Sequence, residues 1–144
     1  MTIRIATVAD MDALVALILR LGHESTLTNG AVVDVAHTTE TVGTFLRSPM
    51  SVFIVAEQDG ALVGVLALVC YPHLLSGEQR LSELCWWMNP EHRGHGNLMM
   101  VEAIAWAKAH GVVSVEMLAP DGRFARYYTR LGFEPRSRVY ERRV

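Results

Sequence analysis

A short glycine-containing segment, Arg93-Gly94-His95-Gly96, is the part of the 144-residue sequence that most directly indicates chemistry. It follows an apolar run that ends at Met88 and a turn at Asn89-Pro90, and it leads into a helical pattern from Asn97. Backbone N–H groups at the start of a helix have no partner within the helix and lie at the positive end of its dipole. Glycines let the backbone approach an anion closely. The segment therefore predicts a cradle for a phosphate group.

Glycines before a helix do not define a phosphate site by themselves, and two better-known phosphate-binding patterns are missing here. No Gly-Lys-Ser or Gly-Lys-Thr follows Gly96, as a Walker loop requires, and the third glycine of the dinucleotide fingerprint is missing. A plain tight turn before the helix is an equal alternative on these residues alone.

Glu83 is the second residue of chemical interest, because it lies in the otherwise apolar run from Arg80 to Met88. Strand alternation places it on the same face as Cys85 and Trp87. Burying a lone carboxylate in such a run is costly, so we expect Glu83 to face a cleft. The alternative is a residue near the start of the strand that only meets water.

Hydrophobic periodicity and turn residues predict the elements that would position these residues. The Asp59-Gly60 dipeptide between two apolar runs predicts a β-hairpin, and Thr7 with Asp10 predicts a capped helix start. The expected elements are strand 2–6, helices 9–21 and 34–47, strands 51–57, 61–71 and 80–88, helix 97–109, strand 112–118, helix 121–131, and a final strand with Val139 and Tyr140. This order predicts one α/β domain over residues 1–144.

Composition favours a compact cytoplasmic domain. Hydrophobic residues make up 51% of the sequence, which is enough for a continuous core. The formal net charge of −2 provides no overall field to attract nucleic acid or a membrane, and we expect neither as a partner. Cys70 and Cys85 lie in apolar runs without metal-type spacing, which predicts buried thiols in a reducing compartment. Residues 1–10 contain no apolar stretch of signal-peptide length, and the longest apolar runs are too short to span a membrane.

Two motifs in register resemble those of the GNAT acyltransferase superfamily. Pro90 to Gly96 resembles its acetyl-CoA-binding signature, Arg/Gln-x-x-Gly-x-Gly/Ala, and Tyr128 to Phe133 resembles its Tyr-x-x-x-Gly-Phe box. The expected element order is similar over nearly the whole chain. The resemblance implies an α/β fold with a central, mostly antiparallel twisted sheet of about six or seven strands flanked by about four helices, in the order β-α-α-β-β-β-α-β-α-β.

The resemblance implies that acetyl-CoA is a co-substrate whose pyrophosphate lies at the glycine segment. The residues that would surround it, mainly through backbone N–H groups, are Arg93, Gly94, His95, Gly96, Asn97 and Leu98. Leu98 departs from the family pattern, which usually has Gly or Ala there, and we expect its side chain to turn into the core. The strand Trp86 to Met88 would splay from the next strand and open a cleft for the pantetheine arm. Trp86, Trp87 and Met88 are therefore expected cofactor contacts, with at least one tryptophan in the core instead.

The resemblance also implies acid and base roles for transfer of an acetyl group to an amine, by direct attack in a ternary complex. Tyr128 would protonate the departing thiolate, because its phenol keeps its proton at neutral pH. Glu83 would accept the proton of the amine through water. His73, in the preceding loop, is an alternative base. His92 and His95 lack the further ligands of a metal site, so no metal is expected.

The acceptor side would be formed by residues 23–47 and 72–79. Its acidic residues are Glu24, Asp34, Glu40 and Glu78. Their charge favours a cationic primary amine, on a small molecule or on a protein. Three alternatives stay open: a non-catalytic acyl-CoA-binding or protein-interaction module of the same fold, a nucleic-acid role for the arginine-rich last residues, which no stacking aromatic supports, and a homodimer formed through open sheet edges.

Overall fold

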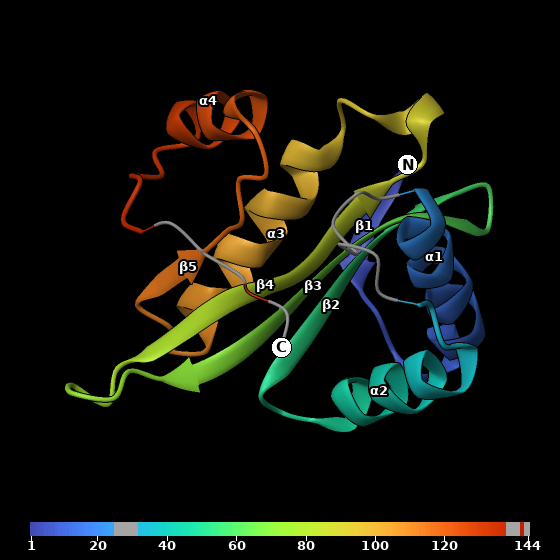
Figure 1. Ribbon diagram of the computed structural model, residues 1–144, viewed down its shortest axis with the longest axis horizontal. Helices are drawn as coiled ribbons and strands as arrows, with labels where there is room; N and C mark the ends of the chain where they lie inside the picture. Colours follow the sequence, from blue (N-terminus) through green and yellow to red (C-terminus); the bar gives the residue numbers. More distant parts are fainter. Residues whose placement is uncertain (25–31, 138–141, 143–144) are drawn as a thin grey trace.

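The computed structural model describes residues 1–24, 32–137 and 142. Within these ranges the chain forms five β-strands, four α-helices and two short 3-10 turns (Figure 1). In chain order they are β1 (Thr2–Ile5), η1 (Val8–Asp10), α1 (Met11–Glu24), α2 (Val35–Arg47), β2 (Ser51–Gln58), β3 (Ala61–Pro72), β4 (Gln79–Met88), η3 (Pro90–His92), α3 (Gly96–Ala109), β5 (Ser114–Glu116) and α4 (Gly122–Arg130). The predicted order is confirmed from the first strand to the last helix.

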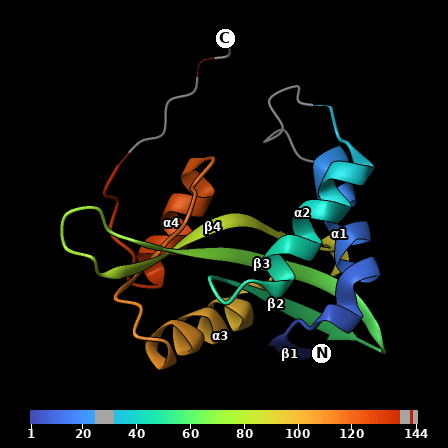
Figure 2. The ribbon, with the colours of Figure 1, turned by 90° about the horizontal axis from the view of Figure 1, so that it is seen from below.

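All five strands belong to one sheet in the order β1-β2-β3-β4-β5. Neighbouring strands are antiparallel except β4 and β5, which are parallel. β2 and β3 form the predicted hairpin, in which Asp59 and Gly60 both have positive φ, 52° and 80°, as a type I′ turn requires. The β3–β4 hairpin extends beyond the helices at one end of the sheet (Figure 2).

The helices cover both faces of the sheet (Figure 1). α1 and α2 lie on one face, where Leu14 belongs to a buried cluster that includes Val65 of β3. α3 and α4 lie on the other face, where Met99 and Tyr128 belong to a second buried cluster with Leu66. The side chains of each inner strand therefore alternate between two hydrophobic cores, one under each helix pair.

The predicted start of the first helix is confirmed by a capping interaction. The Thr7 backbone N–H donates to the Asp10 carboxylate at 2.7 Å. The same carboxylate forms an ion pair with Arg4 at 2.7 Å, and Arg4 also reaches Glu57 at 2.8 Å. These contacts hold the pKa of the Asp10 carboxyl well below its usual range, chiefly through the hydrogen bonds from Arg4. The start of α1 is thereby tied to β1 and β2.

The strand predictions differ from the structure at the C-terminal side. The expected strand 112–118 is reduced to the three residues of β5. At one end, Val112 donates its N–H to Ala107 of α3 at 2.9 Å, and at the other end the Leu118 N–H donates to a side chain, so neither residue extends the ladder. The expected final strand with Val139 and Tyr140 lies outside the described residues, so the described sheet has five strands rather than six or seven.

Candidate active site

β4 and β5 pair over only three positions, and a groove follows the gap that opens beyond them. The last pair joins Ser82 to Glu116. The groove measures about 1900 Å³, and its lining comes from α1, the start of α2, β4, β5, α4 and residues 132–137. Because elements from both faces of the sheet contribute, the gap between β4 and β5 connects the two sides of the molecule.

Glu83 lies in this gap, directly after the last paired residue. Its Oε2 accepts a hydrogen bond from the Leu118 backbone N–H at 2.9 Å, and the carboxylate also interacts with the Tyr128 hydroxyl. Burial raises the pKa of Glu83 from 4.5 to about 7, although both hydrogen-bonding contacts act in the opposite direction. A carboxyl group with this pKa exchanges its proton readily at neutral pH. The expectation that Glu83 faces a cleft agrees with this position.

The predicted face of Glu83 is wrong, because β4 contains a β-bulge. Glu83 pairs with Leu68 and Cys85 pairs with Ala67, which leaves Leu84 as an extra residue between them. The bulge reverses the alternation, so that Glu83 points to the α3–α4 face and Cys85 to the α1–α2 face. Alternation in the sequence alone cannot show an inserted residue.

Tyr128 is held at the end of α4 by a Schellman motif that explains the Tyr-x-x-x-Gly-Phe spacing. Gly132 has a φ of 84° and donates its N–H to Thr129 at 3.1 Å, while Phe133 donates its N–H to the Tyr128 carbonyl at 3.0 Å. The rings of Tyr128 and Phe133 then meet at a centroid distance of 5.6 Å. The motif thus fixes the ring of Tyr128 in the α3–α4 core, beside Glu83.

The surroundings of Tyr128 favour its protonated form. Burial, followed by the nearby charge of Glu83, raises its pKa above the ordinary value. The ring stacks on Trp86 at 6.1 Å, and Tyr127 lies at its edge at 5.8 Å. The Tyr127 hydroxyl is buried without a hydrogen-bond partner among the described residues. Of these two tyrosines, Tyr128 lines the groove and Tyr127 does not.

The two adjacent tryptophans of β4 face opposite sides. Trp86 lines the groove and packs on the α3–α4 face. Trp87 is buried in the other core, where the guanidinium of Arg20 lies 5.1 Å from its ring. The Trp87 side chain therefore lies away from the predicted cofactor side, and Trp87 does not line the groove. Met88 is buried with the α3–α4 core.

The glycine segment forms the N-terminus of α3, as predicted. Gly94 has a φ of 112°, and apart from its two chain neighbours no described residue has an atom within 4 Å of the place where a Cβ would stand, so its backbone is open to a ligand. Gly96 differs, because a Cβ there would lie 2.8 Å from the ring of Trp86. Arg93, His95 and Asn97 are exposed around this helix start.

Leu98 does not turn into the core as expected. Its side chain is 42% exposed, in the first turn of α3, because the positions that follow it, Met99 and Met100, take the buried places of that turn. The Leu98 side chain therefore lies at the surface beside the helix start and is not part of the core.

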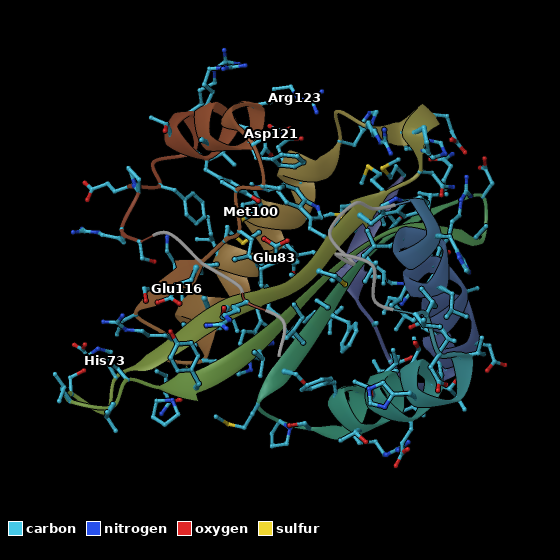
Figure 3. All side chains as sticks on the ribbon, viewed as in Figure 1. His73, Glu83, Met100, Glu116, Asp121 and Arg123 are labelled. Carbon is cyan, nitrogen blue, oxygen red and sulfur yellow. The ribbon has the colours of Figure 1, made fainter. Side chains whose placement is uncertain are left out.

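The alternative base, His73, is not brought to the groove. It lies in the β3–β4 loop, at the far tip from Glu83 (Figure 3), and its Nδ1 is 3.1 Å from the Ser76 hydroxyl. Of the acidic residues expected on the acceptor side, Asp34 lines the groove, whereas Glu40 and Glu78 do not. The side chain of Glu24 lies outside the described part of the chain. The described residues contain no group of three or more His, Cys, Asp or Glu that could hold a metal ion.

Sequence reasoning missed a polar cluster on the acceptor side. The Tyr71 hydroxyl donates to the Glu116 carboxylate at 2.7 Å, and Arg80 forms an ion pair with the same carboxylate at 3.4 Å. The three residues come from β3, β4 and β5 and meet only through the register of those strands. Leu118 was missed for a different reason, since its contribution is a backbone N–H that no residue type identifies.

Comparison with known proteins agrees with this arrangement. A family model described as Acetyltransferase (GNAT) family matches residues 23–133, and the chain therefore belongs to that family. No sequence among curated proteins matches the chain.

Solved structures share the fold at low sequence identity. A ribosomal-protein-alanine N-acetyltransferase from Brucella melitensis biovar Abortus is 15% identical with a TM-score of 0.76, each chain covered over 100%. A transcriptional regulator from Bacillus halodurans is 22% identical with a TM-score of 0.80, covering 99% of both chains. An aminoglycoside acetyltransferase from an uncultured soil sample is 17% identical with a TM-score of 0.75, covering 99% of this chain and 97% of that one.

None of the described helices has both the length and the apolar character that a bilayer-spanning helix requires.

Proposed function

We propose that the protein transfers an acetyl group from acetyl-CoA to a primary amine, by direct attack of the amine in a ternary complex. The observation that carries the proposal is the contact between Glu83 and Tyr128 in the gap between β4 and β5. One group has a pKa of about 7 and the other keeps its proton at neutral pH, which matches a base and an acid for amine acylation.

The residues present fit a coenzyme A thioester. The N-terminus of α3 offers backbone N–H groups and the positive end of a helix dipole, and Gly94 is open to close approach. These groups would bind the pyrophosphate, with Arg93 beside them. Trp86, whose ring lies next to Gly96 at this helix start, lines the groove together with Glu83 and Tyr128. An extended pantetheine arm that follows Trp86 would therefore place its thioester at the acid–base pair.

The proton steps follow from the two residues. Glu83, as carboxylate, accepts a proton from the acceptor ammonium through water, which frees the nitrogen lone pair. The amine attacks the thioester carbonyl, and the nitrogen then loses its second proton to water. The carbonyl re-forms and the carbon–sulfur bond breaks. The Tyr128 hydroxyl donates its proton to the departing thiolate and is reprotonated from solvent. Amide and thiol are the products, and Glu83 returns its proton to water.

The acceptor is proposed to be a cationic amine that enters from the α1–α2 side. Asp34 and Glu116 line this side of the groove, and Arg80 balances part of the Glu116 charge. The solved structures with this fold are named for different acceptors, a ribosomal protein and aminoglycosides. The fold therefore leaves the choice between a small molecule and a protein to experiment.

We further propose a cytoplasmic location, because Cys70 and Cys85 are free thiols. They pack on opposite faces of the sheet and cannot pair with each other.

The first test is calorimetric titration of acetyl-CoA into the wild-type protein and two variants of exposed Asn97. Asn97→Glu places a negative charge at the helix start, where the dipole favours it for folding but where it repels a phosphate. We expect the wild type to bind, Asn97→Gln to bind equally, and Asn97→Glu to bind about tenfold more weakly. Binding by the wild type would justify an amine screen with Tyr128→Phe as the chemical control.

A second candidate function is a non-catalytic acyl-CoA-binding module, which exposed Leu98 at the cradle favours. The two functions separate in the amine screen, because only the enzyme releases free coenzyme A in the presence of an acceptor. Absence of acetyl-CoA binding would contradict both.

A further inference from the structure

Trp86 connects the phosphate cradle to the proposed acid. Its ring lies 6.1 Å from that of Tyr128 with an interplanar angle of 24°, and 5.8 Å from that of Tyr127. The six-membered ring of the indole lies next to Gly96, the first residue of α3. One side chain of β4 therefore contacts α3 at the proposed phosphate cradle and α4 at the proposed acid.

The contact with Gly96 is too close for any other residue type at this position. A Cβ on Gly96 would lie 2.8 Å from Cζ2 of Trp86, 3.4 Å from Cε2 and 3.7 Å from Cη2. Cβ atoms do not approach ring carbons this closely, so the indole would have to move. The rings of Tyr127 and Tyr128 also contact the Trp86 ring, so a displacement of the indole would change its contact with the proposed acid.

We propose that Trp86 is a positioning residue that sets the distance between the phosphate cradle and Tyr128, and that position 96 is glycine because of the Trp86 ring. This inference rests on the proposed acetyl transfer. It differs from the expectation that Gly96 is needed for close approach of a phosphate, a role that the open surroundings of Gly94 fit instead.

A double-mutant cycle separates the two roles of Gly96. We would measure acetyl-CoA affinity by calorimetry, and melting temperature, for the wild type, Gly96→Ala, Trp86→Leu and the double variant. If the Trp86 ring is the reason for glycine at position 96, Gly96→Ala should weaken acetyl-CoA binding about tenfold in the wild type. In the Trp86→Leu background the same substitution should weaken binding less than about threefold. Equal losses in both backgrounds would overturn the proposal.

Gly94→Ala serves as the matched control. Its positive φ strains any residue with a Cβ, and no side chain lies near it. We expect its effect to be the same with Trp86 and with Trp86→Leu. If Trp86→Leu fails to fold, Trp86→Phe replaces it, because phenylalanine keeps an aromatic ring beside Tyr128 but lacks the outer ring carbons that meet Gly96.

The positioning role has its own kinetic readout. Trp86→Leu should lower kcat about tenfold with Tyr128 present and leave kcat unchanged when Tyr128→Phe has already removed the acid. If the loss of kcat in the double variant equals the product of the losses in the two single variants, Trp86 does not act through Tyr128. If the wild type fails to bind acetyl-CoA, the proposed function and the positioning role of Trp86 are both wrong. The melting temperatures of the four proteins then still show whether glycine at position 96 is needed to accommodate Trp86.

Discussion

The carboxylate of Glu83 accepts the backbone N–H of Leu118 at 2.9 Å, across the point where β4 and β5 stop pairing. A side chain thus takes the place of the carbonyl that a continued ladder would have supplied. The interaction satisfies the Leu118 N–H, and it holds a partly buried acid in the gap between two strands. This hydrogen bond by itself lowers the pKa of Glu83, and burial outweighs it and raises the pKa to about 7.

Replacing Glu83 by glutamine should lower kcat/KM for amine acetylation about 100-fold, because the amide cannot accept the proton of the ammonium. The side-chain oxygen of glutamine can still bind the Leu118 N–H, so acetyl-CoA affinity should change little. Exposed Glu78, in the β3–β4 loop, provides the control Glu78→Gln, which removes the same charge away from the groove. Full activity of Glu83→Gln would show that another group is the base.

The pH profile gives a separate test of the same residue. Only ionised Glu83 can act as a base, and its pKa is raised to about 7 by burial. Wild-type kcat/KM should therefore fall about tenfold per pH unit below 7 and level off above it. The residual activity of Glu83→Gln should lack this limb. If Glu83→Gln keeps the same fall in kcat/KM below pH 7, that fall belongs to a different titrating group, such as the acceptor amine itself.

Tyr128→Phe should lower kcat by about 100-fold and leave acetyl-CoA affinity nearly unchanged, since the ring contacts are kept and only the proton donor is lost. The adjacent Tyr127→Phe is the matched control, because its buried hydroxyl has no partner among the described residues. Removing an unpaired buried hydroxyl should leave activity intact and should not lower stability. Equal activity losses in the two variants would contradict the special role of Tyr128.

The sequence predicted the parts of this site that depend on local chemistry. The Tyr-x-x-x-Gly-Phe spacing is itself a helix-ending motif, so the residues that form it also place Tyr128. The glycine segment before α3 is local in the same way. These features need no knowledge of how distant strands pair.

The parts that the sequence could not predict depend on strand register. A single bulged residue, Leu84, moves Glu83 to the opposite face from the one that alternation predicts. The cluster of Tyr71, Arg80 and Glu116 exists only because three strands align. In the sequence, glycine at position 96 could be explained by close approach of a phosphate or by a plain tight turn. The 2.8 Å between a Cβ at this position and the Trp86 ring depends on tertiary packing, and it adds a third explanation that the residue type could not suggest.

Gly132→Ala tests whether the end of α4 places the acid. Gly132 has a φ of 84°, which costs a residue with a Cβ about 1 kcal/mol or more. We expect lower stability and a drop in kcat, because the Phe133 contact that holds Tyr128 depends on this turn. Gly60→Ala, with a similar φ of 80° in the β2–β3 turn, should lower stability by a comparable amount and leave kcat unchanged. Normal kcat in folded Gly132→Ala would separate the turn from catalysis.

The raised pKa of Glu83 also predicts how stability depends on pH. Between pH 4.5 and about 7 the native state holds a proton on Glu83 that the unfolded chain has released. Stability from this residue is therefore present below pH 4.5 and lost as the pH rises through 7. Glutamine at position 83 is neutral, so the variant does not bury a charge at pH 8 and should melt at a higher temperature than the wild type. This difference should disappear near pH 4, where Glu83 is protonated.

The ion pair of Asp10 with Arg4 has the opposite dependence, because the pKa of Asp10 is lowered and its stabilisation is lost in acid. It is present in both proteins and cancels in the comparison. Differential scanning calorimetry of wild type and Glu83→Gln from pH 4 to 8 measures the difference directly. A gap that stays constant with pH would mean that the pKa of Glu83 is the same in the native and unfolded states, which would remove the basis for its role as a base that titrates near neutrality.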